Sequence, residues 1–201
     1  MSRIVLTKAS LSQQRDLLKT YGEVLPSLDL KRRQISAERA RARRQLQELE
    51  QRAQELQAEV ARICPMLAHG HIQLEGLARV VDVQLVEENL IGTRLPRVAA
   101  VVVEVADYGL LSLPFWVDPV VASLREALEI QVRLQVAHGR IERLLRAERV
   151  VTQRFNLFDK VLIPRARSHI RAIAIYLSDA ERAAVVNSKL AKRKKQRTQP
   201  R

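Results

Sequence analysis

The residues of this sequence that could do chemistry are few and poorly placed for it. His69 and His71 flank Gly70 in an expected loop. Two histidines with no cysteine, carboxylate or third histidine placed to complete a ligand set fall short of a metal site. His138 and His169 lie in helical segments, where packing or surface histidines are the ordinary interpretation. The sequence therefore predicts no metal site.

The sequence also offers no activated nucleophile and no nucleotide-binding motif. Cys64 stands beside Pro65 without a suggested base, which is typical of a packed residue at a helix end. Glu87 and Glu88 lie in a β-rich stretch, where we expect solvated edge residues rather than an acid–base pair. Neither GxxxxGK[ST] nor GxGxxG occurs. We predict no catalytic residue and no cofactor, and hence a non-catalytic chain.

The composition favours long helices over a rounded globule. Hydrophobic residues make up 47% of the chain, but aromatics only 3%, and charged residues reach 28%. Such a chain has apolar stripes but few of the large side chains that fill a compact core. The net charge of +13 suits nucleic acid, an anionic membrane surface or an acidic protein. A single cysteine is typical of a reducing, cytoplasmic setting, and no apolar run is long enough to span a membrane.

Apolar residues recur every seven positions in two long segments, residues 10–63 and residues 118–190, as in a left-handed coiled coil. Asp118 before Pro119 is a favourable start for the second helix. The a and d positions form the seam, the stripe on which the two helices meet. The predicted seam includes Leu28, Ile35, Leu49, Leu56, Ile141, Leu144, Val151, Phe155 and Phe158.

The seam has irregular positions. Pro26 should kink or interrupt the first helix, and Pro164 should bend the second. Arg32 and Arg39 occupy seam positions, where they either face water, face an acidic partner, or extend their charged ends out of an ordinary seam. The stripe also changes register after Phe158, which predicts a stutter.

Between the helices the pattern changes to β-branched runs over residues 80–86 and 98–105, with turn chemistry at Gly92. The predicted fold is mainly α: a long antiparallel two-helix coiled coil with a small β-hairpin insert, and with both termini at one end. The expected segments are an N-terminal helix (1–64), a β-containing middle (65–117), a C-terminal helix (118–190), and a basic, disordered tail (191–201).

Short stretches of both helical segments carry a family resemblance. Residues 154–165, with Ile170 to Ile173 and Tyr176 to Arg182, resemble the C-terminal helix of the D subunit of V-type/A-type rotary ATPases. Residues 6–8, 25–31 and 113–118 are similar to bacterial members of that family. A proline between heptad residues, as at Pro164, is unusual in ordinary coiled coils, which makes this part of the resemblance the more specific.

The resemblance implies a central rotor-shaft subunit that hydrolyses nothing itself. Its helical end would insert into the ring of catalytic and nucleotide-binding subunits (A and B types). Its other end would meet the small F-type stalk subunit and the funnel-shaped subunit that caps the membrane ring. Rotation would couple ATP hydrolysis or synthesis to proton or sodium movement. The chain would lie at the cytoplasmic face of the membrane, attached through partners and without nucleic acid.

Within that role, exposed arginines could make weak, screened contacts with acidic loops of surrounding subunits. The candidates for such rotor contacts are Arg32, Arg39, Arg165, Arg167 and Arg171. Two alternatives remain open at this point. A basic helical hairpin could bind nucleic acid, or the coiled coil could be a static scaffold.

Overall fold

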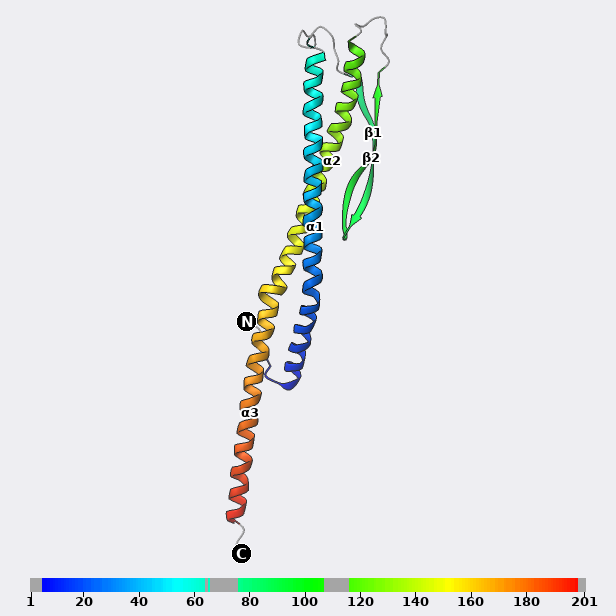
Figure 1. Cartoon of the computed structure of the whole chain (residues 1–201). Coiled ribbons are helices and arrows are strands. Elements are labelled where there is room, and N and C mark those ends of the chain that lie inside the picture. The colour runs from blue at the N-terminus through cyan, green and yellow to red at the C-terminus, as the bar shows by residue number, and fades with distance from the viewer. Residues whose placement is uncertain (1–4, 64, 66–75, 107–115, 199–201) are drawn as a thin grey trace. The chain divides into compact units, whose positions relative to one another are not determined.

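The computed structural model describes residues 5–63, 65, 76–106 and 116–198. The elements in chain order are α1 (Lys8–Ile63), β1 (Ala78–Leu90), β2 (Thr93–Val105), α2 (Val117–Leu157), the π-helical turn η2 (Phe158–Leu162) and α3 (Ile163–Thr198) (Figure 1). This confirms the predicted fold class. The chain divides into two compact units: a hairpin unit, Lys31–Val150, and a terminal unit, Met1–Leu30 with Val151–Arg201.

In the hairpin unit, α1 and α2 run antiparallel. Three ion pairs join them: Arg39 with Glu148, Glu38 with Arg140, and Arg52 with Glu126. Arg52, which lies later in α1 than Glu38 and Arg39, pairs with a residue that lies earlier in α2 than their partners, and this fixes the direction. The buried seam side chains follow heptad spacing: Ile35, Ala42 and Leu56 on α1, and Ile130 and Leu144 on α2. The two stripes therefore bury each other.

The hairpin pairs β1 with β2 from Ala78 opposite Val105 to Leu90 opposite Thr93. A two-stranded hairpin is marginally stable alone, so it needs a surface to pack on. Leu95 is fully buried in the hairpin unit. The predicted turn at Gly92 is confirmed, and the strands are longer than the two β-branched runs. Ile91 and Gly92 both have positive φ (54° and 78°), as a two-residue type I′ turn requires.

In the terminal unit, the start of α1 packs on the end of α2 and on α3. The ring of Tyr21 meets that of Phe158 edge-on, with centroids 5.4 Å apart. Lys8 pairs with Glu181 at 3.3 Å, so the helices are antiparallel here too. Among the described residues of this unit, the buried ones are Val151, Ile163, Ala166 and Ile173.

Two expectations about helix continuity differ from the structure. The sequence predicts that Pro26 kinks or interrupts the first helix, and the interruption does not occur, because α1 continues past Pro26. Half-buried Leu25 and Leu28 continue the seam beside it, and this packing offsets the cost of a proline in a helix interior. α3 extends to Thr198, so residues 191–198 of the basic tail are helical rather than disordered. Lys and Arg are good helix formers, and the charge pattern alone underestimates this.

The register change after Phe158 is produced by η2 and not by the predicted stutter. The N–H of Ile163 donates to the carbonyl of Phe158, five residues earlier. A π-turn takes up one extra residue. The buried stripe accordingly shifts by one position, to Ile163 and Ala166. Pro164 favours this turn, because it has no N–H to donate and its ring would clash with the carbonyl four residues earlier in a regular α-helix.

The π-turn η2 holds one residue more than a regular α-helical turn, so deleting one exposed residue from it should be tolerated. Val161 is 48% exposed within η2. In a Pro164→Ala background, deletion of Val161 leaves the residues before and after η2 on their seam, so we expect little change in the free energy of unfolding. Deleting exposed Ala172 in the same background rotates Ile173 off the seam and should cost at least about 2 kcal/mol. Urea unfolding of both variants checks this, and equal destabilisation would contradict the assignment of η2.

Substitution of alanine for glycine should change the free energy of unfolding in opposite directions at two positions. Gly92 needs positive φ, and an added Cβ meets only the flexible end of Lys31, at 3.6 Å. Gly92→Ala should thus lower the free energy of unfolding by about 1 kcal/mol through backbone conformation alone. Gly139 lies inside α2 with open space at its Cβ position, so Gly139→Ala should raise it by up to about 1 kcal/mol. Thermal unfolding of both variants measures the two signs, and a shared sign contradicts the prediction.

Candidate functional site

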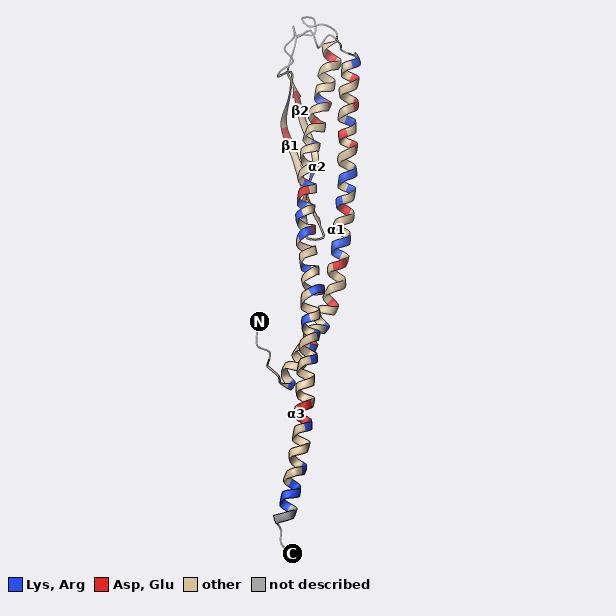
Figure 2. Cartoon of the chain, turned by 90° about the vertical axis from the view of Figure 1, so that its left-hand side faces the viewer, with Lys and Arg blue, Asp and Glu red and all other residues tan. Residues whose placement is uncertain are grey.

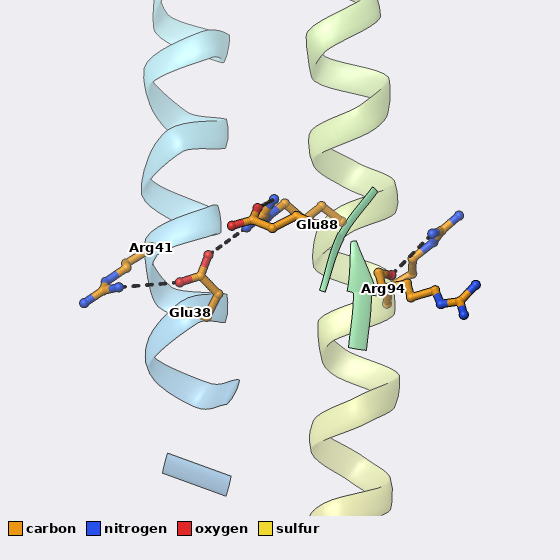
Figure 3. A network of polar contacts seen from close by, with 6 residues as sticks. Glu38, Arg41, Glu88 and Arg94 are labelled. Carbon is orange, nitrogen blue, oxygen red and sulfur yellow. Dashed lines mark hydrogen bonds and ion pairs between the residues drawn. The ribbon is translucent and has the colours of Figure 1, made fainter. Parts of the chain in front are cut away.

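One guanidinium joins three elements of the hairpin unit. Arg140 on α2 donates from Nη2 to Glu38 Oε1 on α1 at 2.8 Å, and from Nη1 to Glu88 Oε2 on β1 at 3.0 Å (Figure 3). The side chains of Arg140 and Glu38 are only 14% and 16% exposed. Arg41 approaches the other oxygen of Glu38, at 3.6 Å. The Arg140 network, Arg140 with Glu38 and Glu88, thus fastens the hairpin to both helices.

The carboxylates of Glu38 and Glu88 stabilise the positive charge of Arg140. Burial by itself lowers the pKa of Arg140, but the hydrogen bonds to Glu38 and Glu88 and their negative charges raise it above its ordinary value. Charged hydrogen bonds to a planar guanidinium are also directional, which fixes the hairpin in orientation as well as in place. The Nε of Arg140 is buried and has no hydrogen-bond partner among the described residues, so the network contains one costly unsatisfied donor.

A second ion pair lies in the seam itself. Arg39 Nη1 contacts Glu148 Oε2 at 2.5 Å, with side chains 24% and 17% exposed. Both residues fall on the predicted heptad stripes. Arg39 therefore faces an acid, and that acid belongs to this chain. Arg32 is half-buried and also has an interaction within the chain. These two proposed rotor contacts belong to the hairpin unit, and the guanidinium of Arg39 is held inside the coiled coil.

The other three proposed contacts are different. Arg165, Arg167 and Arg171 are exposed on α3 in the terminal unit. The five candidates are thus divided between the two units. Basic residues also gather near the C-terminal end of α3, while both signs of charge alternate along α1 (Figure 2).

The nine predicted seam residues are all buried or half-buried. Four are buried: Ile35, Leu56, Leu144 and Val151. The other five are half-buried: Leu28, Leu49, Ile141, Phe155 and Phe158.

The sequence alone does not reveal the Arg140 network. It places Glu88 at a solvated edge, but Glu88 is half-buried and bonded to Arg140. Glu87, its neighbour, is exposed and lies 3.9 Å from Arg94. The available signal is weak: Glu38 follows seam residue Ile35 by three positions, and Arg140 precedes seam residue Ile141. That spacing places both charges at the border of the seam, but it does not identify Glu88 as their partner.

The part of the chain that the structure describes holds no group of three or more His, Cys, Asp or Glu residues that could bind a metal. Cys64, His69 and His71 lie outside the described residues. Among the described helices, none combines the length and apolar character needed to cross a bilayer.

Apolar side chains are exposed in both units. On α3 they are Ile175, Tyr176, Val185, Val186 and Leu190, each at least 50% exposed. On the hairpin they include Val81, Leu85, Val86 and Val102. α3 also continues beyond Glu181, its pairing partner for Lys8, and residues 181–195 are all exposed. Grouped apolar exposure of this kind marks surfaces that contact other proteins.

These features define an antiparallel coiled-coil protein with an inserted β-hairpin and uncovered apolar faces. Residues 10–193 match the family model that describes the D subunit of ATP synthase. The chain is 35% identical over 194 residues to the V-type ATP synthase D subunit of Borreliella burgdorferi, covering 96% of this chain and 95% of that protein. It is 32% identical over 196 residues to the V-type ATP synthase D subunit of Chlamydia muridarum, covering 96% of each. The chain belongs to the ATP synthase D-subunit family.

The Arg140 network should carry measurable stability. Arg140→Met leaves two partly buried carboxylates without their cation, so we expect the free energy of unfolding to fall by about 2 kcal/mol. Arg146→Met is the matched control. It removes an exposed pair with Glu142 (71% and 68% exposed) and should cost less than about 0.5 kcal/mol.

Amide hydrogen exchange shows which part of the hairpin unit loses stability. In Arg140→Met, exchange should accelerate in β1 and β2 more than at the buried seam of α1. Uniform acceleration in both would mean that Arg140 does not specifically fasten the hairpin.

Proposed function

We propose that this chain is the central rotor shaft of a V/A-type ATPase or ATP synthase. It carries torque between ATP hydrolysis or synthesis in the catalytic head and proton or sodium movement in the membrane ring. The observation that carries the proposal is family membership over nearly the whole chain, with relatives of matching length that are V-type ATP synthase D subunits.

The seam supports the mechanical part of this role. A shaft must resist twisting, and two helices locked by interdigitating side chains resist it better than one helix does. The ion pair of Arg39 with Glu148 opposes axial slippage in the hairpin unit, because a shift of one heptad would leave both charges unpaired in the seam. Polar groups within coiled-coil seams often specify register in this way.

The exposed faces support the partner assignments. The exposed end of α3 combines apolar residues such as Val186 and Leu190 with Lys192, Arg193 and Lys195. We assign this end to contacts with the A-type and B-type subunits of the head. The hairpin unit would then meet the small F-type stalk subunit and the funnel-shaped subunit. The chain itself does no chemistry, and it lies at the cytoplasmic face of the membrane through these partners.

The nucleic-acid-binding and static-scaffold alternatives are not favoured by the family assignment. Affinity purification of the tagged chain from native membranes separates the three. A rotor subunit brings down large nucleotide-binding subunits and a membrane ring. An RNA-binding arm brings down RNA at physiological salt, and a static scaffold brings down neither set.

Charge reversal on α3 tests the coupling role. Arg165→Glu, Arg167→Glu and Arg171→Glu together should lower coupled ATP turnover and proton pumping several-fold, because three exposed cationic contacts become repulsive. The matched control is a triple variant at three exposed arginines of the hairpin unit: Arg43→Glu, Arg44→Glu and Arg149→Glu. Turnover and pumping by the purified complex provide the measurement. Unchanged values in the α3 variant would remove these arginines from the rotor contact.

A further inference from the structure

A pocket lies beside the Arg140 network, between α1, α2 and β2 of the hairpin unit, with a volume of about 390 Å³. Its walls include half-buried apolar side chains, among them Leu49 of α1, Val98 of β2 and Val136 of α2. Arg140 also lines it, and the two carboxylates of the network hold that guanidinium in place. The pocket therefore has an apolar floor and one fixed cationic wall.

Positive charge is in excess around this floor. Three arginines line the pocket, Arg97, Arg133 and Arg140, against one acid, Glu48. Glu38 and Glu88 neutralise Arg140, but the other two cations are less well compensated. Arg133 lies 3.3 Å from Glu129, but Glu129 also lies 3.8 Å from Arg125, so its charge is divided between two arginines. The exposed side chain of Arg97 has no ion pair or hydrogen bond within the part of the chain that the structure describes.

We propose that this pocket binds an acidic segment of another protein in the same complex. A carboxylate of that segment reaches Arg97 and Arg133, and an adjacent apolar side chain packs against Leu49, Val98 and Val136. Charge complementarity selects the carboxylate, since guanidinium groups bind carboxylates with paired hydrogen bonds. The apolar floor favours a protein segment over a free inorganic anion, which gains nothing from contact with apolar walls.

The hairpin supplies half of this site. Arg97 and Val98 come from β2, whereas Arg133 and Val136 come from α2. The pocket exists only while β2 lies against the helices, and the bond from Arg140 to Glu88 holds the hairpin there. Binding of the segment and docking of the hairpin should therefore stabilise each other.

The proposal rests on the proposed function for the identity of the complex, and cross-linking in the intact complex tests it. A benzoyl-phenylalanine photo-cross-linker is placed at Gln45, an exposed residue that lines the pocket, in the full chain purified with its partners from native membranes. Gln47, exposed on the same helix and outside the pocket lining, is the matched control position. We expect Gln45, and not Gln47, to cross-link to one segment that contains Asp or Glu.

Charge reversal then tests the chemistry of the contact. Arg97→Glu with Arg133→Glu should lower the cross-link yield at Gln45 by about tenfold, as expected for reversed charges at an interface. Arg43→Glu with Arg149→Glu, at exposed positions outside the pocket, should leave the yield unchanged. Changing the cross-linked acid of the partner to lysine should restore the yield in the Arg97→Glu, Arg133→Glu background.

Each contrary result has a definite meaning. Cross-links only to segments without Asp or Glu, or a yield unchanged by reversal, would overturn the proposal. So would the absence of any protein cross-link at Gln45 while millimolar phosphate protects Arg97 from phenylglyoxal, which would assign a free anion instead. The subunit composition of the same preparation tests the rotor assignment independently. An acidic segment from outside a rotary ATPase would support the pocket and contradict the proposed function.

Discussion

Neither long helical segment of this chain can bury its own apolar stripe. An amphipathic helix of this length exposes a continuous row of Leu, Ile, Val and Ala side chains, and burial of that row is the main source of its stability. The chain meets this constraint by turning back on itself, so that Ile35 and Leu56 of α1 share a seam with Ile130 and Leu144 of α2. The same constraint acts in the terminal unit. There the π-turn η2 brings Ile163 and Ala166 onto the buried stripe.

An apolar seam packs almost equally well when the two helices shift along each other by one heptad. Charged residues are what distinguish the native alignment from the shifted ones. In the hairpin unit, Arg39 and Glu148 meet inside the seam, and Arg140 joins two carboxylates at its border. Partly buried ion pairs contribute little net stability compared with well-packed apolar residues, but breaking one is costly. Such pairs destabilise alternative alignments of the helices more than they stabilise the native alignment. In the proposed role as a rotor shaft, resistance to slippage matters more than added stability.

The sequence predicts most of what depends on local pattern. Heptad spacing identifies the seam residues, and Gly92 identifies the hairpin turn. What it cannot predict depends on the axial alignment of distant segments. Arg39 and Glu148 both lie on predicted stripes, yet only the relative position of the helices makes them partners. Glu88 reaches Arg140 only after the hairpin folds back on α2. The sequence predicts a stutter in place of the π-turn, because a heptad pattern reveals a register change but not the hydrogen bonds that produce it.

The proposed rotation of this chain inside a catalytic head is tested most directly by a reversible cross-link. In a Cys64→Ser background, Arg167→Cys on exposed α3 is paired with a cysteine on the facing loop of a head subunit, and ATP turnover of the intact complex is measured before and after oxidation. We expect turnover to stop when the disulfide forms and to recover fully on reduction. Undiminished turnover with the cross-link complete would contradict rotation of this chain against the head.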